Sequence, residues 1–148
     1  MDHPHPAIEV VIEVPRGGFI KRRPDHTVDF ISPVPCPFNY GSVRGSEAAD
    51  GDPQDALVLG PRLAVGEVCR VRPWARVRFM DDGVVDDKWI CGPHAPTAAD
   101  QRRIAWFFTC YACAKVLLNR VRWRWGSTRY LGLAPLAGAE DTSLPEPG

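Results

Sequence analysis

The stretch DGDPQDALVL, from Asp50 to Leu59, places three aspartates directly before a run of apolar residues. ALVLG is short, apolar and ended by a glycine, so it predicts a buried strand. Carboxylates this close together repel one another and resist leaving water, so a fold that gathers them needs a cation or hydrogen-bond donors beside them. The stretch therefore predicts a buried strand that begins at an acidic cluster, with a cation or hydrogen-bond donors beside it.

Further strands are predicted on both sides of this stretch. AIEVVIEV, residues 7–14, alternates apolar and polar side chains as a half-buried strand does. Three later segments are bounded by Gly, Pro or acidic turns: GEVCRVRP (66–73), WARVRFMD (74–81) and VVDDKWICG (84–92). The proline-rich residues 32–42 predict an ordered loop. This spacing of short strands is typical of a small β-barrel.

One long helix is predicted over residues 96–121. Thr97 and Asp100 fit a capping box. The predicted apolar stripe consists of Ile104, Phe107, Phe108, Tyr111, Ala114 and Leu118. Residues 121–127, VRWRWGS, return to alternation and predict a strand whose tryptophans are buried or lie at a subunit contact; stacking on single-stranded nucleic acid is the alternative.

Composition predicts one soluble domain, residues 1–137, followed by a disordered tail, residues 138–148. The chain has 148 residues, 45% of them hydrophobic, and 18 basic against 18 acidic residues. Zero net charge argues against nucleic acid or an anionic membrane as a partner. The five cysteines are odd in number and lack paired spacing, which favours a reducing cytoplasm. We expect neither a cleaved leader nor a membrane span.

The acidic stretch does not fit a calcium-binding EF-hand. Such a loop starting at Asp50 needs glycine and glutamate where the chain has Asp55 and Pro61. Oxygen ligands without a nearby histidine suit a hard cation, so Mg²⁺ is the first choice and Mn²⁺ the second.

A second acidic cluster, MDDGVVDDKW, contains Asp81, Asp82, Asp86 and Asp87 in a predicted hairpin turn. Two such clusters suggest several metal ions, which can neutralise phosphoryl oxygens and lower the pKa of a bound water. Lys21, Lys88 and Tyr40 would supply donors for phosphate. The simpler interpretation is that these aspartates only cap turns in water.

These segments together resemble the soluble inorganic pyrophosphatases of family I. The resemblance runs from Ile8 to Tyr111 and is carried by IEVPRGG, NYGSV, DGDPQDALVL, AVGEVCRVRP and MDDGVVDDK. It implies a mainly β (α+β) fold, a five-stranded OB-like β-barrel with a flanking C-terminal α-helix. It also implies Mg²⁺-dependent hydrolysis of pyrophosphate to two phosphates by a metal-activated water, without a covalent intermediate, and a homo-oligomer, specifically a hexamer.

The resemblance assigns roles to individual residues. Asp50, Asp55 and Asp86 match metal ligands, and Asp52 matches the acceptor of the proton from the attacking water. Asp81 matches a ligand of a metal that arrives with substrate, Asp82 an acidic neighbour of that metal, and Glu13 a residue on the first strand that holds metal-bound water. Lys21, Tyr40, Lys88 and Tyr111 match phosphate-binding positions, the first three of them also counted as catalytic.

Four positions depart from the family pattern, and two of the changes, at Phe30 and Ala112, remove charges that would bind one end of pyrophosphate. Arg23 stands where a metal-holding glutamate is usual, and Phe30 where an arginine grips phosphate. Cys36 replaces a tyrosine, and Ala112 replaces the lysine after the helix tyrosine. Two alternatives therefore stay open beside the pyrophosphatase: a hydrolase of another phosphoanhydride, and a catalytically weak binding or assembly protein on the same barrel.

Overall fold

The computed structural model describes residues 5–22, 28–32, 34–46 and 51–136, with side chains described for all of these except 20–22 and 28–31. The predicted tail, residues 138–148, lies outside this part of the chain. In chain order the elements are β1 (Ile8–Val14), β2 (Ile20–Arg22), β3 (Val28–Ile31), β4 (Asn39–Val43), β5 (Asp55–Val58), β6 (Val68–Asp81), β7 (Val84–Val85), β8 (Lys88–Gly92), α1 (Ala98–Val121) and β9 (Arg129–Pro135).

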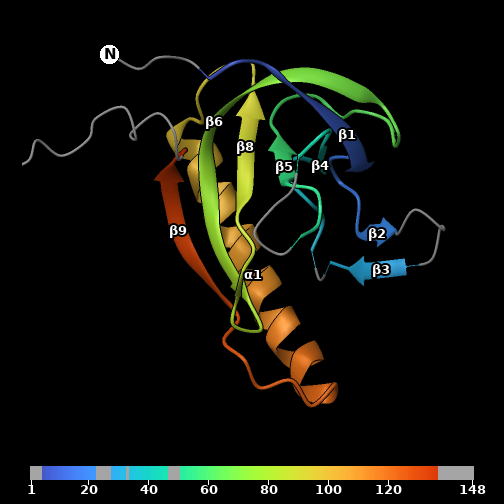
Figure 1. Ribbon diagram of the computed structural model, residues 1–148, viewed down its shortest axis with the longest axis vertical. Coiled ribbons are helices and arrows are strands. Elements are labelled where there is room, and N and C mark those ends of the chain that lie inside the picture. The colour runs from blue at the N-terminus through green and yellow to red at the C-terminus, as the bar shows by residue number, and fades with distance from the viewer. Residues whose placement is uncertain (1–4, 23–27, 33, 47–50, 137–148) are drawn as a thin grey trace, which may run out of the picture.

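Five of the described strands close into a ring, which confirms the expected barrel with a C-terminal helix. The order is β1-β4-β5-β8-β6, and β6 pairs again with β1. All neighbours in the ring are antiparallel except β5 and β8, which run parallel. In Figure 1, α1 runs behind β6, β8 and β9, and the small β2–β3 hairpin projects from the other side.

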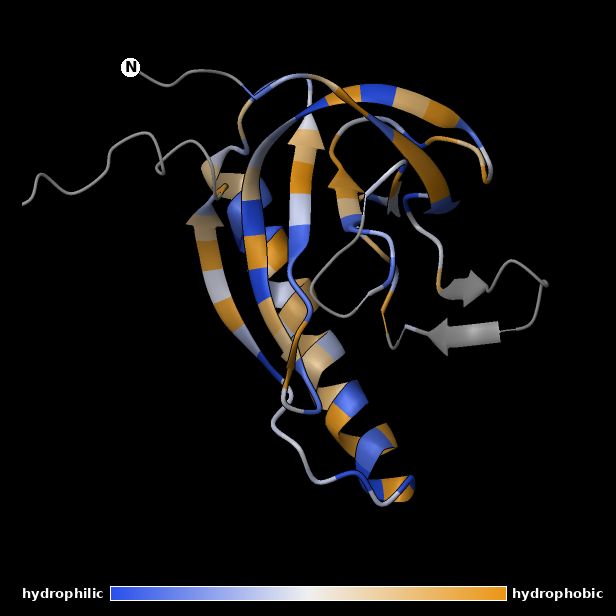
Figure 2. Ribbon diagram, in the orientation of Figure 1, coloured by the Kyte–Doolittle hydropathy of each residue, from blue (hydrophilic) through white to orange (hydrophobic). Residues whose placement is uncertain are grey.

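The central strand β5 is buried on both faces, which explains its unbroken apolar sequence. Ala56 and Val58 point into one buried cluster with Val10 and Ile12 of β1. Leu57 points to the other face, into a larger cluster that contains the buried side of α1. Figure 2 shows the contrast with α1, whose ribbon alternates between hydrophobic and hydrophilic residues.

The two strands predicted over residues 66–81 form one continuous strand, β6. Pro73 was expected to end a strand, and that prediction is wrong. Proline has no N–H for a ladder, but it is tolerated at a bulge. The register shifts between Pro73 and Ala75 where β6 pairs with β8. Because β6 continues through this irregularity, its first half can pair with β1 while its second half pairs with β8 and β9.

The predicted loop over residues 32–42 is correct only for its proline-rich part. From Asn39 onward no proline interrupts the chain, and β4 pairs with β1 on one side and β5 on the other. The segment predicted as one strand over 84–92 is divided into β7 and β8 at Asp86. The hairpin turn between β6 and β7 is confirmed, whereas β2, β3 and β9 were not predicted.

The predicted helix is confirmed as α1, with the capping box at Thr97 and Asp100 present in both directions. The predicted apolar stripe is confirmed in the first half of the helix, where Ile104, Phe107 and Phe108 are buried in the core. By length and composition alone α1 is apolar enough to cross a membrane. The core helix of a soluble protein passes the same test, and the inner side of α1 packs against the barrel.

Residues 121–127 do not form the predicted strand. The helix ends at Val121, and Trp123 adopts a positive φ of 57° in the turn that follows. Trp123 and Trp125 are 82% and 66% exposed, so burial of these rings within the chain is ruled out. The Arg120 guanidinium lies 4.6 Å from the centre of the Trp125 ring, a cation–π contact.

Candidate functional site

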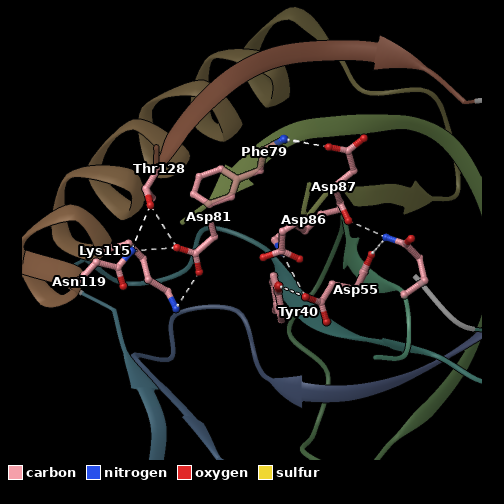
Figure 3. Close-up of polar contacts among 11 residues, drawn as sticks. Tyr40, Asp55, Phe79, Asp81, Asp86, Asp87, Lys115, Asn119 and Thr128 are labelled. Carbon is pink, nitrogen blue, oxygen red and sulfur yellow. Dashed lines mark hydrogen bonds and ion pairs between the residues drawn. The ribbon is translucent and has the colours of Figure 1, made fainter. Parts of the chain in front are cut away.

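A buried lysine holds two aspartates together at one end of the barrel. Lys88 Nζ lies 2.7 Å from Asp86 Oδ2 and 3.2 Å from Asp55 Oδ2. The Lys88 side chain is only 1% exposed, whereas those of Asp55 and Asp86 are 18% and 22% exposed. The Tyr40 hydroxyl donates to the same Asp55 oxygen over 2.8 Å. Figure 3 shows Tyr40, Asp55 and Asp86 converging on one point.

Strand pairing explains why these residues meet. Asp55 begins β5 and Lys88 begins the parallel neighbour β8, with Ala56 opposite Trp89. On the other side, Tyr40 lies opposite Leu57, so Tyr40 and Asp55 are diagonal neighbours on one face of the sheet. The two acidic segments, about thirty residues apart in sequence, are therefore joined by adjacent strands.

The pKa of Tyr40 is raised well above its ordinary value, first by burial and then by the negative charge of Asp55. Tyr111 and Asp86 raise this pKa further. Tyr40 therefore remains a neutral hydrogen-bond donor throughout the range in which proteins are stable. Tyr40 and Tyr111 also line a small, mostly apolar cavity of about 30 Å³, to which Cys36 and Phe107 contribute.

Asp81 belongs to a different group of contacts. Its Oδ1 accepts hydrogen bonds from Asn119 Nδ2 at 3.1 Å and Thr128 Oγ1 at 3.2 Å, and Lys115 Nζ lies 3.4 Å from its Oδ2. Burial alone would raise the pKa of Asp81, but the Lys115 charge and these hydrogen bonds lower it overall. Figure 3 shows this group beside α1, apart from Asp55 and Asp86.

Asp82 serves the turn between β6 and β7. Its Oδ1 accepts from the Gly126 backbone N–H over 2.8 Å, and its own N–H donates to Thr128 Oγ1. A side chain at Gly126 would place a Cβ only 2.3 Å from Asp82 Oδ1, so this close approach requires glycine. The structure thus directs Asp82 toward the segment after α1 rather than toward Asp55.

Neighbouring residues Asp86 and Asp87 face in different directions. Asp86 contacts Lys88, whereas Asp87 Oδ1 accepts from the Phe79 N–H over 3.0 Å and its Oδ2 lies 3.6 Å from Arg76. Gln54 joins the two acidic segments, because its Nε2 donates to the backbone oxygens of Asp55 and Asp87.

The remaining predicted residues are placed as follows. Glu13 is half-buried at a bulge in β1, where the register shifts between Ile12 and Val14, and such bulges redirect side chains. Asp52 is exposed in the bend before β5. Lys21 pairs with Phe30 through the backbone of the β2–β3 hairpin. Asp50 and Arg23 lie outside the described residues.

Asn39 and Gln54 support the site but were not predicted. Asn39 is fully buried and makes four hydrogen bonds, accepting from the N–H groups of Arg16 and Leu63 and donating to the oxygens of Val58 and Pro61. It therefore fixes the start of β4, directly before Tyr40. The signal in the sequence was an asparagine between two aromatic residues. Its hydrogen-bond partners lie far away along the chain, so the sequence did not reveal its role.

The donor set at Asp55 and Asp86 fits a hard divalent cation. Both carboxylates already converge on one positive group, the Lys88 ammonium, and all their donor atoms are oxygens. Among the described residues, no three acidic, histidine or cysteine side chains gather closely enough to hold a metal. Asp50, the third expected ligand, is outside that part of the chain.

Comparison with known proteins agrees with this arrangement. The family model described as inorganic pyrophosphatase matches residues 10–121. The chain is 43% identical over 95 residues to a protein named inorganic pyrophosphatase from Gluconobacter oxydans, covering 59% of this chain and 55% of that one. It is 35% identical over 113 residues to one from Aquifex pyrophilus, covering 69% and 64%. The chain thus spans little more than half to just under two thirds of the length of these curated relatives.

Solved structures are similar over more of the chain. The inorganic pyrophosphatase from Thermus thermophilus superposes with a TM-score of 0.71 at 27% identity, covering 91% of this chain and 86% of that one. The one from Neisseria gonorrhoeae gives 0.68 at 28% identity, covering 92% and 84%.

Proposed function

Since this chain belongs to the inorganic pyrophosphatase family, we propose that it hydrolyses inorganic pyrophosphate to two phosphates in a reaction that requires Mg²⁺. The observation that carries this proposal is the convergence of four residues: Tyr40 of β4, Asp55 of β5, Lys88 of β8, and Asp86 from the segment between β7 and β8. Buried charges are costly unless they are compensated, so a cluster of this kind on a surface-facing edge favours a functional role.

Asp55 and Asp86, with Asp50, would hold the metal ions, and Glu13, near the end of β1, would hold metal-bound water. When bound, divalent ions neutralise phosphoryl oxygens and lower the pKa of water. Mg²⁺ is preferred and Mn²⁺ would substitute, because the ligands are oxygens only.

The chain's own residues would bind substrate and take the proton. Lys21, Lys88, Tyr40 and Tyr111 would donate to phosphate oxygens. Asp52 would accept a proton from the attacking water as its oxygen bonds to one phosphorus and the bridging P–O bond breaks. Exposure of Asp52 is consistent with this role, because the acceptor must pass its proton on to solvent.

A hydrolase of a different phosphoanhydride is the second candidate. Ala112 is buried in the core cluster, so it supplies no cation where the resemblance expects a lysine. Cys36 lines the apolar cavity beside Tyr40 and Tyr111. Both features favour a substrate whose far end carries less charge than pyrophosphate.

Phosphate release from pyrophosphate and from nucleoside and organic diphosphates, each with Mg²⁺ or a chelator, tests both candidates. Asp52→Asn should abolish release, whereas Glu9→Gln, a surface carboxylate paired with Arg44, should leave it unchanged. Release from another diphosphate alone would establish the second candidate. No release from any substrate would favour the binding or assembly protein.

We further propose a homo-oligomer in the cytoplasm. The end of α1 exposes a group of apolar side chains that a second copy would cover: Leu117, Val121, Trp123 and Trp125. All five cysteines are free thiols, which suits a reducing compartment. Light scattering on the purified chain measures the assembly, and a monomer at all concentrations would contradict it.

A further inference from the structure

Lys115 forms an ion pair with one carboxylate oxygen of Asp81. Lys115 Nζ lies 3.4 Å from Asp81 Oδ2, and the side chains of Lys115 and Asp81 are 21% and 24% exposed. The ion pair joins α1 to the end of β6, at the edge of the molecule where the second acidic cluster begins.

The other Asp81 oxygen is also used. Asn119 and Thr128, which are 4% and 9% exposed, both donate to Oδ1. Asn119 Nδ2 donates to Thr128 Oγ1 as well, so the three side chains form a closed network. A carboxylate oxygen accepts about two hydrogen bonds, so Oδ1 has little capacity left for a metal.

Helix geometry places Lys115 beside the substrate-binding face. Lys115 follows Tyr111 by four residues, one helical turn, so the two side chains share a face of α1. Lys115 Nζ lies 5.9 Å from the centre of the Tyr111 ring. Tyr111 in turn acts electrostatically on Tyr40, which contacts Asp55.

We propose that Lys115 supplies at Asp81 the positive charge that a bound divalent ion would otherwise supply, and that Asp81 is therefore not a metal ligand in this chain. A divalent ion at Asp81 would have to displace the Lys115 ammonium from Oδ2 or the Asn119 and Thr128 donors from Oδ1. Asp55 and Asp86 also contact a lysine, but there two carboxylates share the one Lys88 ammonium, which leaves a negative charge for a divalent ion to neutralise. The site would then use metal ions at Asp55 and Asp86 together with a fixed cation at Lys115. The inference rests on the proposed metal-dependent function.

Mn²⁺ binding, measured by equilibrium dialysis and by electron paramagnetic resonance, tests this directly when it is done both without substrate and with methylene diphosphonate, a pyrophosphate analogue that is not hydrolysed. Asp81→Asn in the otherwise unchanged chain should leave the number of bound ions the same and their affinities within about twofold. Lys115→Met should add one Mn²⁺ site or tighten one at least tenfold. The double variant with Asp81→Asn should lose that gain.

Loss of a bound ion in Asp81→Asn would overturn the inference, as would a Lys115→Met chain that binds Mn²⁺ like the parent. Lys115→Gln is the second variant if methionine disturbs α1, and Lys115→Arg should bind like the parent because its charge is retained. A parent chain that binds no Mn²⁺ at all would instead contradict the proposed function. The added or tightened Mn²⁺ site in Lys115→Met tests the role of Lys115 at Asp81, whereas Mn²⁺ binding by the parent chain tests the proposed function.

Discussion

Replacing Lys88 by methionine tests whether the buried ammonium holds the acidic site together. Removing one member of a fully buried ion pair costs about 3–5 kcal/mol, whereas exposed pairs are worth about 0–1 kcal/mol. Lys88 is almost fully buried, but Asp55 and Asp86 each keep about a fifth of their exposure. We therefore expect an intermediate loss of about 2–3 kcal/mol in the free energy of unfolding.

Thermal unfolding with a chelator present is the assay. For a domain of this size a loss of that magnitude lowers Tm by about 5–10 °C. Adding Mg²⁺ should raise the Tm of Lys88→Met more than that of the parent chain, because the metal no longer competes with the ammonium and stabilises by mass action. Methionine has a similar volume, so a cavity contributes little.

Asp86→Asn provides the matched control. In the parent chain it removes a partner from Lys88 and should destabilise, but in Lys88→Met it removes one of two repelling carboxylates and should restore stability. This reversal of sign is the signature of direct coupling. If Lys88→Met melted within about 2 °C of the parent in chelator, or if Mg²⁺ shifted both chains equally, the electrostatic account of the site would be refuted.

Three further results are expected. Gly41→Ala would place a Cβ 2.1 Å from the Val11 carbonyl oxygen, forcing β4 away from β1, so urea unfolding should show a loss of about 3 kcal/mol or more; an unchanged midpoint would contradict this packing. Thr97→Ala removes the cap of α1 and should cost about 1 kcal/mol in a thermal melt, whereas Thr97→Ser should cost little. The lowered pKa of Asp81 means that its ionised form stabilises the fold above the ordinary value of 3.8, and that this contribution is lost as pH falls below it. Asp81→Asn should therefore destabilise at pH 7 and lose its effect as the pH falls through the lowered pKa of Asp81, and a difference that stays constant with pH would show that charge is not involved.

Local patterns in the sequence predicted the elements whose signals lie within a few residues of one another. The alternation of residues 7–14 matched β1, since Val10, Ile12 and Val14 share one side of the strand and are buried. The capping box at Thr97 and Asp100 predicted the start of α1, because both bonds form within four residues. The acidic stretch before β5 and the turn at Asp82 were recognised for the same reason: their signals are local.

What only the tertiary structure decided depends on contacts between distant residues. β6 passes through Pro73 because pairing with β1, β8 and β9 outweighs one missing donor, and none of these partners is visible locally. Pairing of the parallel strands β5 and β8 brought Asp55 to Lys88, 33 residues apart. The four aspartates of the second cluster look alike in sequence, but the fold turned each to a different partner: Asp86 to Lys88, Asp87 to Phe79, Asp81 to Lys115 and Asp82 to Gly126. A carboxylate's role follows from the charge and donors that the fold places beside it, and a linear sequence does not contain that neighbourhood.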